Sequence, residues 1–392
     1  MISTGRLYQI NSSRILQHIR NNRGISRITI ANELNLDRST ITKIVSQLID
    51  YGMVLTTGKY HGKPGVGRMS TALEINPEYG LVLGIEVQTE FFRTVLVNLD
   101  GRLIESDAMA YRNGNGSLED QLENLIAAAE SLARKEGLPL LGAGIGLSGI
   151  VDPYSGTIIL SNPLKIESPL NLKERLALRT GLPIFIENDA NCCCWGEMAF
   201  RPDRQHRNFL ALLGEFRNID IAENRKSGIA AGLGIVIRGN VLHGDNFTAG
   251  EFRSLKYDNR KPSHSQFSIS DEEAQSLPEN RELLLKVFGE LAYNVSLLVN
   301  SLDITKVVVA GDFSRYSAEF EPLLRSEIQT NWLYQTEKKC AFEFPADAAQ
   351  AVSFGAAGLF ICKLFSVPDM TDHIDEDVGY ILLEKLRSAT IA

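Results

Sequence analysis

The chain has 392 residues, a length that suits two or three domains, and carries 40 Lys and Arg against 48 Asp and Glu. It contains no leader sequence and no apolar run long enough to span a membrane, so we expect a cytoplasmic protein without a membrane partner. Five cysteines, three of them adjacent, do not form a disulfide framework.

The charge is unevenly distributed along the chain. Residues 1–70 hold ten basic and three acidic side chains, a net charge of +7, whereas the remainder holds 30 basic and 45 acidic side chains, a net charge of −15. The acidic total taken alone argues against nucleic acid. A basic N-terminal end on an acidic body instead predicts one localised surface that binds a polyanion.

Residues 26–52 have the pattern of a helix-turn-helix. Ser26 stands at an N-cap position ahead of apolar residues at helical spacing, and residues 35–37 interrupt the pattern. A second helix opens at Asp37 or Arg38. Its polar face has the residue types that contact bases and phosphates in a major groove: Arg38, Ser39, Thr40, Thr42, Lys43, Ser46 and Gln47. Arg27 joins this candidate set. The alternative is an ordinary helical hairpin with a solvated polar face.

The flanking segments complete a predicted winged helix over residues 1–75. Asn11-Ser12-Ser13 is expected to cap a preceding helix, and Gly52 is expected to end the third helix. Short strands are expected at 53–55 and 72–75, joined by a glycine-rich basic hairpin that contains Lys63 and Arg68. We expect Arg68 to enter a minor groove. The alternative is a linker whose basic residues only offset the acidic body.

Residues 76–392 alternate between predicted strands and helices, which indicates an α/β body. The expected strands are 80–87, 92–100, 102–106, 142–149, 183–187 and 306–311. The expected helices are 117–136, 172–180, one that opens at 188–191, 281–302 and 346–364.

Three motifs in this body carry a resemblance. They are Ile186-Glu187-Asn188-Asp189-Ala190-Asn191 with Trp195-Gly196-Glu197, Gly239 to Gly244 with Ala249-Gly250-Glu251, and Val307 to Gly311. With the basic N-terminal segment, the chain resembles the ROK family, which contains sugar kinases and sugar-responsive repressors such as those for xylose and N-acetylglucosamine. The resemblance implies a winged helix-turn-helix followed by an actin-like ATPase (ribonuclease H-like) body of two α/β lobes.

The resemblance also implies a sugar site. Asp189 matches the kinases' general base, Asn188 matches the amide that binds the sugar, and Glu251 matches a carboxylate that holds neighbouring hydroxyls. Asn188 and Asp189 stand where a strand meets a helix, the place where open α/β sheets bind ligands. Two carboxylates and an amide suit a polyol. The alternative role for Asn188 and Asp189 is a helix cap.

The chain departs from the kinase pattern at both phosphate loops. Glu86-Val87-Gln88-Thr89-Glu90 replaces the Asp-x-Gly-Gly-Thr turn, and Gly228 to Gly234, preceded by an inserted segment from Glu215 to Lys226, replaces the second loop. The loss of glycines obstructs close backbone approach, and Glu90 would repel phosphates. We therefore expect no catalytic residue, no phosphate transfer and no cofactor.

The family's zinc ligands are also missing. Ser254 replaces the usual His, and no Cys occurs between Cys194 and Cys340, so we expect no metal. Ser254 becomes a candidate effector contact. Cys192, Cys193 and Cys194 point in different directions on a helix and are expected to be small buried residues. His243 and His264 do not make a metal site by themselves.

These expectations favour a sugar-responsive transcriptional regulator, and a repressor of carbohydrate uptake or catabolic genes in particular. It would bind double-stranded operator DNA as a homodimer or tetramer, and its effector would be a sugar or sugar derivative. Two alternatives stay open: an ATP-dependent sugar kinase with a DNA-binding head, and a DNA-binding protein whose body only dimerises.

Overall fold

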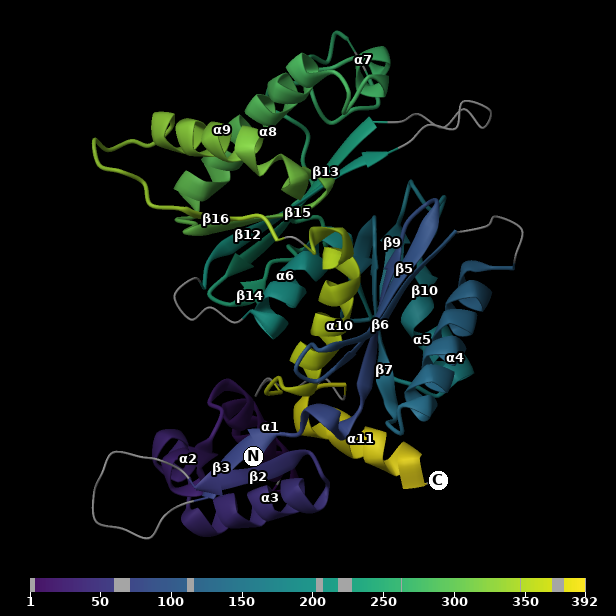
Figure 1. Ribbon diagram of the computed structural model, residues 1–392, viewed down its shortest axis with the longest axis vertical. Coiled ribbons are helices and arrows are strands. Elements are labelled where there is room, and N and C mark those ends of the chain that lie inside the picture. Colours follow the sequence, from purple (N-terminus) through teal and green to yellow (C-terminus); the bar gives the residue numbers. More distant parts are fainter. Residues whose placement is uncertain are drawn as a thin grey trace.

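The computed structural model describes residues 4–59, 71–110, 116–201, 207–217, 228–261, 263–345, 347–368 and 377–391. It places a small N-terminal unit against one end of a two-lobed body (Figure 1). In these ranges the body contains two five-stranded sheets with two helices between them. This is the two-lobed α/β arrangement that the sequence predicts.

The N-terminal unit is a winged helix. Its elements are α1 (Thr4–Asn21), β1 (Ile25–Ser26), α2 (Arg27–Leu34), α3 (Arg38–Asp50), β2 (Val54–Lys59) and β3 (Thr71–Ile75), and the antiparallel sheet has the order β1-β3-β2. Ser26 caps α2 as predicted, since its hydroxyl accepts the backbone N–H of Thr29 at 3.1 Å. Gly52, with a φ of 76°, follows α3 in the left-handed region, also as predicted.

The first helix begins earlier than the sequence predicts. Asn11-Ser12-Ser13, the expected cap, lies inside α1, because residues 4–10 extend the helix and Ile10 is buried. The Ser13 hydroxyl accepts a hydrogen bond of 2.8 Å from the backbone N–H of Tyr380, at the start of α11 (Gly379–Ile391). Ser13, which the sequence predicts to cap α1, therefore accepts a backbone N–H at the start of α11, near the other end of the chain.

Lobe I is built on a mixed sheet of order β11-β7-β4-β5-β6. Its strands are β4 (Leu81–Val87), β5 (Phe91–Asn98), β6 (Leu103–Ala110), β7 (Leu140–Leu147) and β11 (Ile184–Asn188). The helices α4 (Leu118–Lys135) and α5 (Leu172–Thr180) cover its outer face. A short sheet of β8 (Ile150–Asp152), β9 (Thr157–Leu160) and β10 (Leu170–Asn171) lies beside β11, and η1 (Pro77–Tyr79) leads in from the winged helix.

Lobe II is built on a sheet of order β14-β13-β12-β15-β16. Its strands are β12 (Phe209–Arg217), β13 (Gly228–Ile237), β14 (Asn240–Val241), β15 (Lys306–Gly311) and β16 (Ala341–Glu343). Helices α8 (Arg281–Ser301) and α9 (Ser317–Thr330) pack on its outer face, with α7 (Asp271–Gln275) at the far end. Short 3-10 turns, η3 (Asp312–Tyr316) and η4 (Ala348–Gln350), border the gap between the lobes.

Two helices, α6 (Asp189–Phe200) and α10 (Ala351–Leu364), fill the space between the sheets (Figure 1). α6 packs on β12 and β13 of lobe II, and α10 packs on β4 and β7 of lobe I. The two helices approach very closely: a Cβ added at Gly355 would stand 1.9 Å from the carbonyl oxygen of Cys192. Small residues therefore join α6 and α10 into one tightly packed pair.

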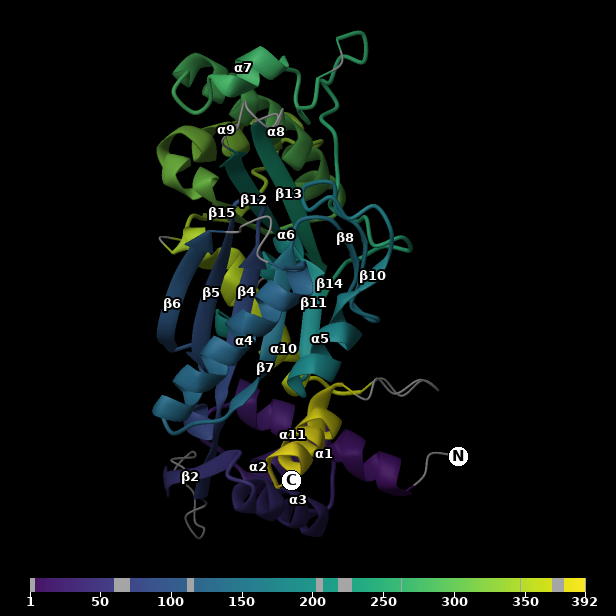
Figure 2. The same ribbon diagram turned by 90° about the vertical axis from the view of Figure 1, so that its right-hand side faces the viewer.

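The C-terminal helix α11 packs against α1 of the winged helix (Figure 2). The Tyr8 and Tyr380 rings meet edge to face with centroids 6.0 Å apart. The predicted division at residues 75 and 76 stays a prediction. Among the described residues, no helix is long and apolar enough to cross a membrane.

Candidate functional site

The outer face of α3 presents part of the predicted DNA-contacting set. Arg38, Ser39, Thr42 and Lys43 are exposed, while Thr40 and Ser46 are half-buried beside them. The opposite face is buried in the core of the unit through Ile41, Ile44, Val45 and Leu48. The amphipathic pattern thus leaves the polar face of α3 open to a ligand.

Other predicted DNA contacts are placed differently. Gln47 turns toward the interior, where its amide is hydrogen-bonded to the hydroxyls of Tyr8 and Tyr51. Arg27 is half-buried at the start of α2. Lys63 and Arg68 lie in residues 60–70, outside the described residues, so their role stays a prediction.

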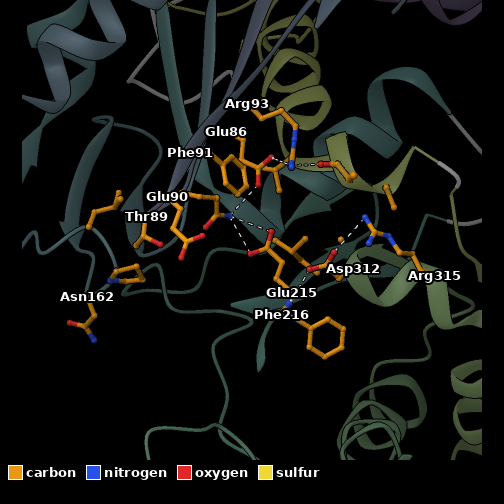
Figure 3. Close-up of a pocket in the computed structure, with 18 of the residues that line it drawn as sticks. Glu86, Thr89, Glu90, Phe91, Arg93, Asn162, Glu215, Phe216, Asp312 and Arg315 are labelled. Carbon is orange, nitrogen blue, oxygen red and sulfur yellow. Dashed lines mark hydrogen bonds and ion pairs between the residues drawn. The ribbon is translucent and has the colours of Figure 1, made fainter. Parts of the chain in front are cut away.

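A cavity of about 420 Å³ lies between the two lobes (Figure 3). Lobe I lines it from the turn between β4 and β5 and from residues 162–165. Lobe II lines it from the end of β12 and from η3, and Ala348 and Ala349 of η4 and Val352 in the first turn of α10 also line it. The turn that would approach nucleotide phosphates in a kinase therefore forms one wall of this cavity.

Side chains occupy that wall. The Glu86 carboxylate is 1% exposed and lies 2.7 Å from the guanidinium of Arg93, which also donates to the carbonyl of Ala349. Burial raises the pKa of the Glu86 carboxyl above its ordinary value, and the neighbouring Arg93 opposes this shift. Glu90, the other acidic residue of the turn, is exposed at the cavity.

A hydrogen-bonded bridge crosses the cavity from lobe to lobe. The amide of Gln88 donates to Glu86 at 3.2 Å and to the carboxylate of Glu215, on β12, at 3.3 Å (Figure 3). Asp312 accepts the backbone N–H of Phe216 at 3.0 Å beside it. A triphosphate placed here would meet several carboxylates and would have to displace this bridge.

The segment that replaces the second phosphate loop of the kinases is part of a strand. Residues 228–234 belong to β13 and pair continuously with β12, from Arg217 opposite Gly228 onward. Gly234 serves packing, because a Cβ there would lie 2.4 Å from the sulfur of Cys194 on α6. Of the proposed insertion, residues 218–226 lie outside the described residues.

Asn188 and Asp189 stand at the start of α6, as predicted. The Asn188 side chain caps the helix by accepting the N–H groups of Ala190 and Asn191 at 2.9 and 3.2 Å. Its amide nitrogen donates to the carbonyl of Gly149 at 3.1 Å. Asp189 is 7% exposed. The capping role is therefore real, and it fixes both side chains at the junction between the lobes.

Sequence reasoning missed the group that organises this junction. Glu187 is fully buried, and its carboxylate accepts hydrogen bonds from the indole of Trp195 at 3.0 Å and the amide of Asn191 at 3.2 Å. Nε2 of His243 lies 2.8 Å from the same carboxylate. Glu187 thus ties the first motif to the second. The four-residue spacing of Glu187, Asn191 and Trp195 is the signal that could have revealed it.

Glu251 and Ser254 differ in placement. Glu251 is exposed and follows Gly250, whose added Cβ would lie 1.7 Å from the carbonyl of Leu233 on β13. Ser254 is buried, and its hydroxyl accepts hydrogen bonds from the Lys256 backbone and the Asn294 side chain, both at 3.1 Å. Ser254 therefore fastens its loop to α8, and its role as an effector contact stays a prediction.

The adjacent cysteines are buried on α6, as expected, and burial raises the pKa of each thiol. In the described ranges, no cluster of three or more His, Cys, Asp or Glu side chains is arranged to hold a metal ion. The expected absence of metal stays a prediction.

Residues 82–253 match the model of the ROK family, and residues 10–54 match a model described as winged helix-turn-helix DNA-binding. Over residues 82–253 the body of this chain is thus similar to the ROK family, and the segment ahead of it is similar to winged helix-turn-helix domains. The ROK match covers β4 through Glu251 and so contains both motifs that meet at the start of α6.

Known ROK proteins similar to this chain include regulators and kinases. The xylose repressor of Caldicellulosiruptor bescii is 29% identical over 247 residues, which are 62% of this chain and 58% of that repressor. The chain therefore spans about three fifths of the length of this curated relative.

Two solved structures share the fold. A ROK family transcriptional regulator described as a homolog of the E. coli MLC protein has a TM-score of 0.74 at 19% identity, over 97% of this chain and 99% of that one. A ROK family glucokinase from Streptomyces griseus, solved with glucose and AMPPNP, has a TM-score of 0.52 at 20% identity, over 71% of this chain and 99% of that one. At these identities the likeness confirms the predicted fold class: a winged helix on an actin-like ROK body.

Proposed function

We propose that this protein is a sugar-responsive transcriptional repressor that binds its sugar without phosphorylating it. The proposal rests on a difference between two parts of the body, the part that would bind the sugar and the part that would bind the nucleotide phosphates. The start of α6 keeps Asn188 and Asp189, which suit a polyol, whereas Glu86, Gln88 and Glu215 line the cavity wall that would receive nucleotide phosphates.

The DNA-binding part of the proposal rests on α3. Four polar or basic side chains are exposed along the face opposite its buried core, and residues 1–70 carry a net charge of +7 on an acidic protein. One short recognition helix reads few bases, so we propose a homodimer that binds an inverted repeat.

The sugar part of the proposal begins with xylose. The curated relatives include xylose repressors from Caldicellulosiruptor bescii and Bacillus subtilis, which makes a free pentose the first effector to try. Asn188, Asp189 and Glu251 supply the amide and carboxylates that bind vicinal hydroxyls.

The proposed test selects duplex DNA bound by the purified chain from a random pool and then titrates the selected duplex with and without xylose. We expect an inverted repeat and an operator affinity that xylose changes. Arg38→Ala and Lys43→Ala should each weaken binding and lower the slope of log affinity against log salt by about 1. Arg260→Ala, at an exposed arginine on lobe II, is the matched control. Operator affinity that Arg38→Ala and Lys43→Ala leave unchanged would contradict the assignment of α3.

A further inference from the structure

We infer that Arg20, in the last turn of α1, couples the sugar site to the DNA-binding unit by contacting the far ends of α6 and α10 together. The inference rests on the proposed function, because it names the route by which that sugar site would act. Arg20 would be a positioning residue that touches neither sugar nor DNA.

Helix α6 connects the proposed sugar site with the winged helix. Its N-cap is Asn188 and its first residue is Asp189, both assigned to the sugar. Its last turn contains Ala199, whose carbonyl accepts a hydrogen bond of 3.0 Å from the Arg20 guanidinium. Twelve helical residues span about 18 Å, so one rigid element reaches from the sugar site to the winged helix.

Helix α10 must move together with α6. Gly355 packs against the α6 backbone so closely that a Cβ would stand 1.9 Å from the Cys192 carbonyl, and a Cβ at Gly358 would stand 2.9 Å from the Trp195 carbonyl. Interlocked helices of this kind shift as a unit. Val352, in the first turn of α10, lines the interlobe cavity.

Arg20 contacts both α6 and α10 at their C-terminal ends. Its guanidinium carbon lies 4.8 Å from the ring centroid of Phe365, the residue that caps α10. A guanidinium also complements the partial negative charge at the carboxyl end of α6. Displacement of the α6–α10 pair therefore changes two contacts of one side chain.

The core of the winged helix connects α1, which carries Arg20, with α3. Ile15, Leu16 and Ile19 of α1 belong to the same buried core as Ile44 and Leu48 of α3. Since packed cores transmit displacement rather than absorb it, a shift at the end of α1 repositions the polar face of α3.

Arg23 provides a matched comparison three residues along the chain. It joins the winged helix to the body through an ion pair of 2.7 Å with Asp100, in the turn between β5 and β6 of lobe I. The Arg23 side chain is 68% exposed and that of Asp100 is 36% exposed. This contact involves neither α6 nor α10, so its loss should leave the coupling intact.

The experiment measures the Kd of the selected operator with and without saturating xylose, and the Kd of xylose with and without the operator. The coupling is the ratio of the Kd values measured with and without the second ligand. Linkage requires the operator ratio and the xylose ratio to be equal in wild type, and we expect each to be about 5–150-fold. Arg20→Ala and Arg20→Gln should reduce both ratios to less than about twofold while each ligand alone binds as in wild type. Arg20→Lys should restore much of the coupling, and Arg23→Ala should retain it.

The outcomes separate the inference from the proposed function. Full coupling in a folded Arg20→Ala or Arg20→Gln protein would overturn the role of Arg20 and leave the repressor intact. Equal loss of coupling in Arg23→Ala would also overturn it, because any contact between the winged helix and the body would then suffice. A wild-type operator affinity that xylose does not change would overturn the xylose-responsive function itself, and the route with it.

Discussion

Gly355→Ala is expected to destabilise the protein, because the added methyl group would force α6 and α10 apart. The new Cβ would stand 1.9 Å from the Cys192 carbonyl oxygen, whereas ordinary van der Waals contact begins at 3.4 Å. The helices would have to separate locally by about 1.5 Å. Overpacking of this kind costs about 1–3 kcal/mol, which exceeds the gain of about 1 kcal/mol that Ala brings to a helix interior.

Gly289→Ala is the matched control, because Gly289 also lies inside a helix, α8, but a Cβ there would meet no atom within 4 Å. This variant should be more stable than wild type by about 0.5–1 kcal/mol. Urea unfolding followed by circular dichroism gives the free energies. The fluorescence of Trp195, on α6, reports the helix pair directly. A Gly355→Ala protein as stable as Gly289→Ala would refute the close packing of α6 and α10.

Two further variants test local features. Ser26→Ala removes the cap of α2 and should cost about 1 kcal/mol in the free energy of unfolding, measured by urea denaturation with Ser39→Ala, at an exposed serine of α3, as the control. Because burial raises the pKa of Glu86 in the folded state, the native protein holds a proton that the unfolded chain releases above its ordinary pKa of 4.5. Wild type should therefore lose stability relative to Glu86→Gln as the pH rises above the ordinary Glu pKa of 4.5, and parallel pH profiles of the two proteins would contradict this.

Local signals predicted several elements closely. The helix predicted over 172–180 is α5 with those bounds, and the one predicted over 281–302 is α8, which ends one residue earlier. Asn171 and Asn280 cap these helices, and apolar residues recur at helical spacing behind them. Strong caps and an unbroken period leave few alternatives.

The failures all involve residues far apart in the chain. Ser13 looks like an N-cap in isolation, but residues 4–10 extend α1 ahead of it, and its hydroxyl instead accepts the backbone N–H of Tyr380. The bridge from Gln88 to Glu215 depends on how two lobes meet, which no local pattern encodes. The glycines among residues 228–234 suggest a phosphate loop by composition, yet Gly232 and Gly234 lie in β13 where α6 packs against it.

For the candidate sites too, the features set by local sequence were predicted, and those set by tertiary contacts were not. The exposed polar face of α3 and the position of Asn188 and Asp189 follow from helix period and from the junction of strand and helix. Gln47 lies on the same helix face by sequence, but the tyrosines that bind it come from α1 and from the end of α3. Ser254 faces Asn294, a partner that the motif could not reveal.

A thermal-shift titration of the purified full chain with xylose, other sugars and Mg-ATP tests the central claim most directly. A ligand that binds only the native state at 100 times its Kd stabilises it by about 2.7 kcal/mol, which raises the Tm by several degrees. The account predicts that a sugar raises the Tm, that Mg-ATP does not, and that Asp189→Asn abolishes the sugar's effect. A rise with Mg-ATP, or no rise with any sugar, would contradict it.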